Sequence, residues 1–527
     1  MSAKACAEPL ARKHLRKYEH DWRVSIVSLF SFDCMGVRAV YAFMKACGYD
    51  TDLVFLKEHA VNRFEMPSEW EMGLFISLLK EREVKAVGLG VRSPYMSFAV
   101  ELTERIHEEL GIPVIWGGVA ATVTPEQCVL GGADYAVCGE GEEAFAEVVT
   151  ALATGGDANS IANVWHKGCD GPVGNPLRPL VADLDSLPIP DLTDANKFFV
   201  EFGRLQEGDP WRRRLRYEIA GSRGCPYDCT YCSNSVFHEL YKGLGRFVRL
   251  RSVGHVVREL EYAKEMMLNL GFVFFYDEVF GVDLEWLREF KQAYSTRIGL
   301  PFNCVSDPRS ITEEKVKLLS EAGVADFNVG IQAGSDKVRR ELLNRRLSNE
   351  QILNVAGLMK KYGINSRYDI IADNPFESRA DKRATLDLLM RLPRPFILNI
   401  FSLNHLPGTQ LTKLALERGI ISEEDVVGKS DRCLRQYWVS FDFPRSREDQ
   451  CWNALFSMSS KWFIPKFALR FIAGTEWFMR HPLPAVVLAR LSNLLRLMFD
   501  GTRLLLRRQI DLDYVRRFSG SIGSLHR

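Results

Sequence analysis

Three cysteines lie close together in the stretch GSRGCPYDCTYCSNS (221–235), at Cys225, Cys229 and Cys232. The spacing C-x3-C-x2-C puts three thiolates on one short loop, from which they could bind one face of an iron–sulfur cluster. Such clusters usually take four cysteine ligands, so three cysteines leave one iron open to another group. A zinc site completed by His238 is one alternative, and three unrelated thiols are the other.

The composition limits the classes of protein to consider. The chain has 527 residues, a formal net charge of +1 and 46% hydrophobic residues. A chain of this length predicts three or four domains at about 150 residues each, and its balanced charge gives no reason to expect nucleic-acid binding. Twelve cysteines in so long a chain do not indicate a disulfide framework. Because we find neither a signal peptide nor a membrane span, we expect a reducing cytoplasm and thiols that serve metal or redox chemistry.

Residues 24–150 alternate short apolar runs with amphipathic segments, which predicts a parallel, doubly wound sheet. GVRAVYAFMKACG and FAVELTERIHEELG are expected helices that end at Gly48 and Gly111, because glycine commonly follows a helix. Ligands of such sheets bind at the carboxyl ends of the strands. The expected strands are RVSIVSLF, TDLVFL, VKAVGLGV, IPVIWGG and ADYAVCG.

A second alternation begins at RYEIAG and predicts an incomplete (β/α)6 barrel of the TIM type, with its chemistry at the carboxyl ends of the strands. The cysteine loop follows the first of these strands. SNEQILNVAGLMKKYG is an expected helix that opens with a Ser348–Gln351 capping box and closes at Gly363, and another ends at Gly323. The remaining expected strands are GFVFFYD, PFNCVS, DFNVGI, SRYDII and FILNIFS.

These patterns divide the chain into five parts. The stretch between the two alternating regions is rich in Gly, Asn, Pro and Asp and predicts a linker with room for a small hairpin. The predicted parts are an amino-terminal extension (1–22), a Rossmann-like domain (23–152), a linker (153–212), a partial barrel (213–412) and a helical carboxyl-terminal region (413–527).

The cysteine loop and the strands around it resemble the radical S-adenosylmethionine (SAM) superfamily over residues 216–415. The resemblance implies a [4Fe–4S] cluster on Cys225, Cys229 and Cys232, with the amine and carboxylate of SAM on the fourth iron. Reduction of SAM by this cluster would give a 5′-deoxyadenosyl radical that abstracts hydrogen from unactivated carbon. The protein then supplies orientation and exclusion of water, and the cofactor supplies the chemistry.

The same resemblance assigns SAM contacts to several motifs. Tyr231 is the aromatic residue before the last cysteine, FFYDEVF carries an acidic pair, VGIQAGSD resembles the fourth-strand motif, and an arginine pair follows it. For the first acidic residue the alternative is a helix N-cap, and for the arginines it is a solvated helix end. The implied SAM contacts are Tyr231, Asp277, Glu278, Gln332, Ser335, Arg345 and Arg346.

The amino-terminal domain resembles the cobalamin-binding domain found before many radical SAM domains. IPVIWGGVAATVTPEQ and GADYAVCGEGEEAF carry this resemblance, and paired glycines allow the backbone to approach a flat ring. An ordinary doubly wound sheet with glycine turns is the alternative. The implied cobalamin contacts are Gly117, Gly118, Thr122, Gly139 and Glu140.

One feature departs from the cobalamin pattern. Many such domains carry D-x-H-x-x-G, whose histidine ligates cobalt from below, whereas the first loop here reads SFDCMGVR, with Asp33 and no histidine. We therefore expect cobalamin without a histidine lower ligand. The third-strand loop VRSPYM would lie under the ring instead, with Arg92 and Tyr95 as neighbours.

The carboxyl-terminal tail is apolar and basic. Helices of this composition can lie on anionic membranes, which would favour a lipid substrate. We expect instead a helical cap over the barrel mouth, with Trp462 and Trp477 in the core and His405 toward the substrate. The arginines that interleave with large apolar residues are Arg470, Arg480, Arg490, Arg496, Arg503, Arg507 and Arg508.

Together the two resemblances imply a cobalamin-dependent radical SAM C-methyltransferase, in which one SAM is the radical source and a second remethylates cobalamin. A cobalamin-dependent cyclase or rearrangement enzyme shares the same motifs. A methylthiotransferase would need three further cluster cysteines, for which the first domain offers only the scattered Cys34, Cys47, Cys128 and Cys138. A non-catalytic metal scaffold is the last alternative.

The expected partners follow from this function. They are a small-molecule or lipid substrate and an external electron donor such as flavodoxin or ferredoxin, without nucleic acid. The expected location is the cytoplasm, with peripheral membrane contact through the carboxyl-terminal region as a further possibility.

Overall fold

The computed structural model describes residues 22–58, 66–428 and 445–506. These residues form two compact units. The described part of the first unit comprises 22–218, 222–270 and 405–428, and that of the second comprises 219–221, 271–404 and 445–506.

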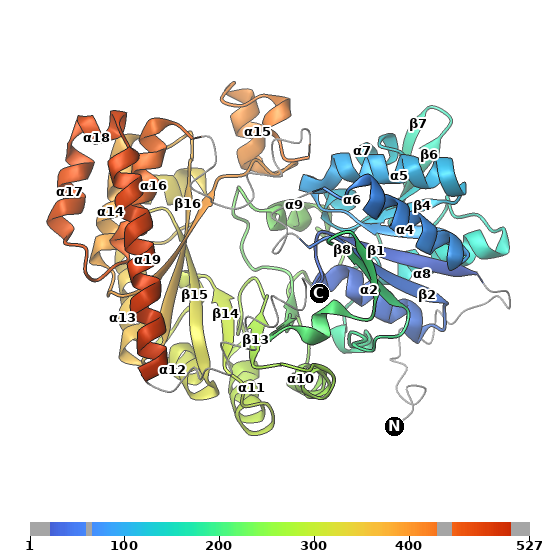
Figure 1. Ribbon diagram of the computed structural model, residues 1–527, viewed down its shortest axis with the longest axis horizontal. Coiled ribbons are helices and arrows are strands. Elements are labelled where there is room, and N and C mark those ends of the chain that lie inside the picture. Colours follow the sequence, from blue (N-terminus) through green and yellow to red (C-terminus); the bar gives the residue numbers. More distant parts are fainter. Residues whose placement is uncertain (1–21, 59–65, 429–444, 507–527) are drawn as a thin grey trace. The chain divides into compact units, whose positions relative to one another are not determined.

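The first unit is built on a nine-stranded sheet of order β7-β6-β5-β4-β3-β1-β2-β8-β9 (Figure 1). Strands β1 to β5 pair in parallel in the order 2-1-3-4-5, which confirms the predicted doubly wound sheet. In this order β1 and β3 flank the switch point, and ligands bind outside the carboxyl ends of such strands. The five strands are β1 (Arg23–Leu29), β2 (Thr51–Leu56), β3 (Val84–Gly90), β4 (Val114–Gly117) and β5 (Tyr135–Val137).

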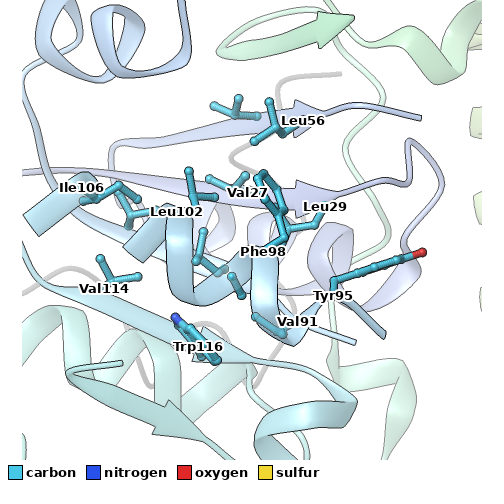
Figure 2. Packing of buried hydrophobic residues seen from close by; sticks show 14 of the residues in the cluster. Val27, Leu29, Leu56, Val91, Tyr95, Phe98, Leu102, Ile106, Val114 and Trp116 are labelled. Carbon is cyan, nitrogen blue, oxygen red and sulfur yellow. The ribbon is translucent and has the colours of Figure 1, made fainter. Parts of the chain in front are cut away.

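Helices cover both faces of this sheet. Helices α2 and α8 pack against each other on one face, where Gly88 and Gly90 of β3 lie beneath side chains of α8 and α2. On the other face, α4 and α5 bury a core that includes Val27, Phe98 and Trp116 (Figure 2). The helices are α2 (Met35–Ala46), α4 (Glu69–Glu81), α5 (Met96–Leu110), α6 (Val119–Val123), α7 (Pro125–Leu130) and α8 (Glu142–Thr154).

The stretch predicted as a linker contributes four strands to the same sheet. Strands β6 (Val164–Gly168) and β7 (Gly171–Gly174) form a hairpin antiparallel to β5. Strand β8 (Lys197–Glu201) pairs in parallel with β2 and turns back into β9 (Arg204–Glu207). Edge strands of four or five residues carry too little apolar periodicity to be recognised in sequence, so only a small hairpin was foreseen here.

The first unit contains further elements outside its nine-stranded sheet. Strands β11 (Ser222–Arg223) and β12 (Arg249–Leu250) pair antiparallel. The cysteine loop and the helix that follows it lie between them in the sequence. The helices are α9 (Ser233–Leu240), α10 (Val253–Met266) and α15 (Gln410–Glu417).

The second unit contains the predicted barrel strands as an open sheet of order β10-β13-β14-β15-β16-β17. Strands β13 to β17 pair in parallel. Of β10 (Arg216–Ile219), Ile219 belongs to this unit, and its carbonyl accepts the Tyr276 N–H at 2.8 Å. The other strands are β13 (Phe272–Phe275), β14 (Phe302–Ser306), β15 (Val324–Gln332), β16 (Asn365–Ala372) and β17 (Ile397–Ser402).

The two helices that the sequence predicts in this unit are present. Ser348 and Gln351 form the expected capping box, and Gly323 ends its helix in the left-handed conformation at φ 93°. Buried aromatic side chains fix α11 on the sheet, with Phe290 5.3 Å from Phe275 between ring centroids. The helices are α11 (Leu284–Arg297), α12 (Glu313–Ala322), α13 (Asn349–Lys361) and α14 (Arg379–Arg391).

The described carboxyl-terminal residues are helical, as expected. They form α16 (Arg447–Ser459), α17 (Lys466–Gly474), α18 (Glu476–Arg480) and α19 (Leu483–Leu506), which group together in Figure 1. Helix α16 packs against α14 and α19. Within the described ranges no helix is both long enough and apolar enough to span a bilayer. Arg507 and Arg508 lie outside the described residues.

The two compact units differ from the domain spans that the sequence predicts. The cysteine loop, α9 and α10 belong to the first unit although they follow the first barrel strand, and so do residues 405–428. These segments form one compact unit with the Rossmann-like sheet. The predicted spans remain predictions.

Candidate functional site

The cysteine loop ends at the amino terminus of α9. Cys232 is the N-cap residue of this helix, and its N–H donates to the Cys229 carbonyl at 3.1 Å. Cys229 is buried, and Cys225 and Cys232 are half-buried. The positive end of the helix dipole favours a thiolate at the N-cap, and the Asn234 amide lies 3.7 Å from the Cys232 sulfur. Hydrogen bonds to sulfur are one means of tuning an iron–sulfur cluster.

Backbone contacts from two other segments fix the path of this loop. Gly224 has φ +90°, and a Cβ there would lie 2.3 Å from the Phe247 carbonyl oxygen, so only glycine fits without a shift. The Thr230 carbonyl accepts the Leu411 N–H at the start of α15 at 3.0 Å. The loop is therefore held through its main chain.

The zinc alternative required His238 as a fourth ligand. In the structure His238 Nε2 lies 2.7 Å from the Cys225 carbonyl oxygen and its ring stacks 4.0 Å from Phe247. Across the described ranges, no three His, Cys, Asp or Glu side chains converge on a point where one ion could bind. The thiolates of a four-iron cluster each bind a different iron, so this arrangement favours the cluster over a mononuclear site.

The two glycine turns expected to meet cobalamin are joined through one threonine. The Thr122 hydroxyl donates to the Gly118 carbonyl at 2.9 Å and accepts the Gly139 N–H at 2.8 Å. Gly118 has φ +94°, and a Cβ there would lie 2.8 Å from the Val91 carbonyl oxygen. A Cβ on Gly117 would meet no atom within 4 Å. The backbone at Gly117 is thus accessible to a large flat ring.

Ion pairs connect the Gly139–Glu142 turn to the strand that leads into the cysteine loop. Arg223, two residues before Cys225, contacts Glu140 at 2.9 Å and Glu142 at 2.6 Å. Arg249 on the paired strand contacts Glu140 at 3.0 Å. Although burial opposes its charge, Arg223 and Arg249 hold the pKa of Glu140 below its ordinary value. Glu140 therefore joins the two sequence signatures within the first unit.

Helix α9 also packs directly on the cobalamin-side loops. A Cβ on Gly139 would lie 1.5 Å from the hydroxyl of Tyr241, the C-cap residue of α9. Helix α9 contacts α6, and Gly408 brings the segment before α15 against Val236 of α9 and Val123 of α6. Helix α9 thus packs against the loops at the carboxyl edge of the nine-stranded sheet.

The first and third loops at the switch point have different surroundings. Asp33 of the first loop is hydrogen-bonded to the Ser31 hydroxyl at 2.7 Å and lies beside Glu218. Burial and the Asp33 charge raise the pKa of Glu218 to about 8. In the third loop Arg92 is half-buried. Tyr95 is only 2% exposed, and its ring centroid lies 4.9 Å from that of Phe30. Figure 2 shows Tyr95 at the edge of the core.

The acidic pair after β13 lies in the second unit. Asp277 is buried and its carboxylate accepts the Gly221 N–H at 3.0 Å, whereas Glu278 is exposed. Asp277 does not cap α11, because this helix begins at Leu284 and its N-cap is Asp283. Gly221 precedes Cys225 by four residues in the chain. Glu278 presents the more accessible carboxylate for a SAM amine.

The fourth-strand motif is distorted at the end of β15. Gln332 has φ +68° and sits at an irregularity in the pairing of β15 with β16. Ser335 is buried and donates to Asp381 at 2.6 Å. Arg345 is buried, 2.8 Å from Asp307 and 2.6 Å from the Gly330 carbonyl, whereas Arg346 is exposed. A strained residue at a strand end is typical of ligand sites.

One acidic side chain in the middle of the barrel sheet was not singled out from the sequence. Asp369 of β16 accepts amide N–H groups of Asn328 at 2.9 Å and Asn399 at 2.7 Å, from the strands on either side. Burial raises the pKa of Asp369 to about 6. A charged residue inside the strand SRYDII was the available signal, because strand interiors rarely hold unpaired carboxylates.

The predicted site residues therefore fall into two groups. The cluster cysteines, Tyr231 and all predicted cobalamin contacts lie in the first unit, and the remaining predicted SAM contacts lie in the second. The residues fit the groups that the sequence implies: three thiols on a loop held by its backbone, and glycine turns with an accessible face. Which of them touch each cofactor stays a prediction.

Comparisons with known proteins agree with this arrangement. The family model of the B12 binding domain matches residues 25–149, and that of the radical SAM superfamily matches residues 219–389. The uncharacterized methyltransferase PH0819 of Pyrococcus horikoshii is 26% identical over 361 residues, which are 65% of this chain and 72% of the relative. The anaerobic magnesium-protoporphyrin IX monomethyl ester cyclase of Rubrivivax gelatinosus is 26% identical, over 62% of this chain and 56% of the cyclase.

A solved structure shares the fold over almost the whole chain. The cobalamin-dependent SAM radical enzyme OxsB, with aqua-cobalamin and SAM bound, matches with a TM-score of 0.62 and 15% identity over 96% of this chain and 83% of its own. A B12 binding domain uses cobalamin, and a radical SAM domain uses a [4Fe–4S] cluster and SAM. The chain thus carries a B12 binding domain followed by a radical SAM domain, the domain order of cobalamin-dependent radical SAM enzymes.

Proposed function

We propose that the chain is a cobalamin-dependent radical SAM methyltransferase that methylates an unactivated carbon. When bound, the cluster and SAM supply a 5′-deoxyadenosyl radical and methylcobalamin supplies the methyl group. Cys225, Cys229 and Cys232 would hold the cluster, and the turns at Gly118 and Gly139 would receive the corrinoid. The chain's own task is to keep these two groups in a fixed relation and to exclude water from the substrate.

The observation that carries this proposal is the connection between the two signatures inside the first unit. The Arg223 guanidinium bridges Glu140 and Glu142 of the cobalamin-side turn, two residues before the first cluster cysteine. Tyr241 closes the other end of the cysteine helix against Gly139. An enzyme that used only one of the two cofactors would have no need to join their loops in this way.

The test is anaerobic reconstitution with iron, sulfide, hydroxocobalamin and SAM, under a low-potential reductant. Methylation predicts equal amounts of 5′-deoxyadenosine and S-adenosylhomocysteine, because one SAM is cleaved and another donates its methyl group. Cys229→Ala should abolish iron binding and both products. The matched control is Cys169→Ala, since Cys169 is exposed in the β6–β7 turn, and it should leave both unchanged. If Cys229→Ala lost only one of the two products, or neither, the proposal would be contradicted.

A cyclase or rearrangement enzyme is the second candidate, supported by the similarity to the Rubrivivax gelatinosus cyclase. Such an enzyme would form 5′-deoxyadenosine without S-adenosylhomocysteine. Its product would lack the additional CH2 unit that methylation adds. Mass spectrometry of the product therefore separates the two activities.

A methylthiotransferase and a non-catalytic metal scaffold gain no support from the described residues. Burial raises the pKa of Cys47 and of Cys138 to about 12, and the Cys138 thiol donates to the Ala121 carbonyl at 3.0 Å. Such protonated, packed thiols do not suit a second cluster, which a methylthiotransferase would require. A non-catalytic scaffold would bind iron but would not cleave SAM, so the same reconstitution tests it.

We infer the partners from this chemistry. The enzyme would take a small-molecule or lipid substrate and receive electrons from flavodoxin or ferredoxin in the reducing cytoplasm. Nucleic acid is not an expected partner, because the net charge of the chain is only +1.

A further inference from the structure

Helix α19 turns its large apolar side chains outward and its small and polar side chains inward. Its described buried face is made mainly of the small residues Ala485, Ala489 and Ser492, together with Val486. On the opposite face, Leu483 is 71% exposed and Leu494 is 56% exposed. A helix of a water-soluble domain shows the reverse pattern. Small residues between helices and large apolar residues outside are typical of helices in contact with lipid.

Helix α17 continues this apolar surface. Phe467 is 74% exposed and Phe471 is 65% exposed, while Leu469 between them is buried. Trp462 and Trp477, which the sequence predicted in the core, are both more than half exposed. Trp462 lies 5.9 Å from Phe499 of α19 between ring centroids. We call the exposed apolar side chains of residues 462–499 the outer face.

The outer face far exceeds the single apolar residues that ordinary surfaces carry. Its aromatic members are also of the kind that concentrates at the boundary between lipid and water, where an apolar ring can be buried beside polar headgroups. The exposure of Trp462 and Trp477 corrects the core positions that the sequence predicted for them.

The charges around the outer face have one predominant sign. Residues 462–499 include five Lys or Arg and one Asp or Glu. Lys466 and Arg470 are exposed on α17 beside the two phenylalanines. The acidic Glu476 is engaged by Arg379 at 2.6 Å. An anionic surface complements this pattern, because long basic side chains can reach headgroups while their stems stay in the apolar layer.

We propose that the outer face docks the enzyme on the surface of an anionic lipid bilayer. Helices α17 and α19 would lie in the interface with their apolar side chains among the upper acyl chains, as amphipathic helices do. The enzyme would then act at a membrane surface without spanning the bilayer. This inference is independent of whether the reaction is a methylation or a cyclisation.

The test uses the full chain, reconstituted as above, and vesicles of phosphatidylcholine with or without phosphatidylglycerol. We expect the enzyme to sediment with the anionic vesicles and much less with the neutral ones, and high salt should weaken the binding. Phe467→Ser/Phe471→Ser should lower the vesicle affinity by about tenfold or more. Leu268→Ser is the matched control, because Leu268 is equally exposed, at 68%, in the first unit.

A second variant separates charge from apolar contact. Lys466→Gln/Arg470→Gln should reduce the preference for anionic vesicles and its salt dependence while sedimentation at low salt persists in part. The proposal is overturned if the native chain fails to bind anionic vesicles, or if the phenylalanine variant binds as the native chain does. It is also overturned if the native chain is a dimer that the phenylalanine variant converts to a monomer, without vesicle binding, since the outer face would then bind a second copy.

Discussion

Replacing Asp209 by asparagine would test how the first loop of the cobalamin-side sheet is supported. Arg38 of α2 donates to the Phe32 carbonyl of that loop at 2.9 and 2.6 Å. Asp209 contacts the same guanidinium through both oxygens at 2.8 Å and contacts Lys197 at 2.9 Å. All three charged side chains are almost fully buried. The residue that neutralises this cluster comes from the stretch that the sequence predicted as a linker.

The structure sets the expected size of the effect. Asp209→Asn leaves the buried Arg38 without its carboxylate and leaves Lys197 only the more distant Asp191, at 3.6 Å. Breaking a buried ion pair from one side costs about 3–5 kcal/mol. Burial lowers the pKa of Lys197, so this lysine can release its proton and relieve part of the repulsion. We therefore expect a loss near the lower limit, about 3 kcal/mol, in the free energy of unfolding of the first unit.

Acid should have a related effect on the native chain. Although burial opposes its charge, Arg38 and Lys197 lower the pKa of Asp209 from 3.8 to about 2. A depressed carboxyl pKa stabilises the folded state above the unfolded-state pKa and loses this contribution as pH falls. The contribution of Asp209 to the free energy of unfolding is about 2 kcal/mol. In the native chain it should disappear as pH falls from about 4 to 2, and in Asp209→Asn it should be absent.

The assay is urea unfolding followed by tryptophan fluorescence, because Trp116 and Trp211 are buried in the first unit. Glu207→Gln removes the same charge from an exposed residue two positions earlier and should change stability by less than about 0.5 kcal/mol. Asp209→Asn/Lys197→Met should recover part of the loss, and Asp209→Asn should also weaken retention of cobalamin. Equal unfolding curves for Asp209→Asn and Glu207→Gln would refute the reasoning.

Two further predictions concern the cysteine loop and the first loop. Gly224→Ala forces a Cβ to 2.3 Å from the Phe247 carbonyl oxygen, so iron binding should fall sharply. The control is Gly243→Ala, which is also at positive φ but has open space around its Cβ. It should lower the free energy of unfolding by only about 1 kcal/mol and should still bind iron. If the two variants bind iron equally, the close approach at Gly224 is wrong. Burial and Asp33 raise the pKa of Glu218 from 4.5 to about 8, so the folded state retains a proton that the unfolded state releases. Stability should therefore fall by at most about 5 kcal/mol as pH rises from about 4.5 to 8, and Glu218→Gln should flatten this decline. Parallel pH profiles of the native chain and the variant would count against this assignment.

Local patterns allowed much of the fold to be predicted. The cysteine spacing, the alternation of strands with helices and the glycine and serine caps depend on residues near one another in the chain. These signals predicted the doubly wound sheet, the barrel strands and both cofactor signatures. The capping box at Ser348 and the helix end at Gly323 follow the same logic, because a cap is decided within one helical turn.

Contacts between distant residues were decided only in the tertiary structure. Arg223 meets Glu140 across 83 positions and Arg38 meets Asp209 across 171, and no local pattern pairs such residues. The assignment of the cysteine helix to the first unit and the outward apolar face of α19 have the same origin. A side chain's charge and size are written in the sequence, but whether it is buried, paired or exposed depends on which elements pack against it, and that is settled only when the whole chain folds.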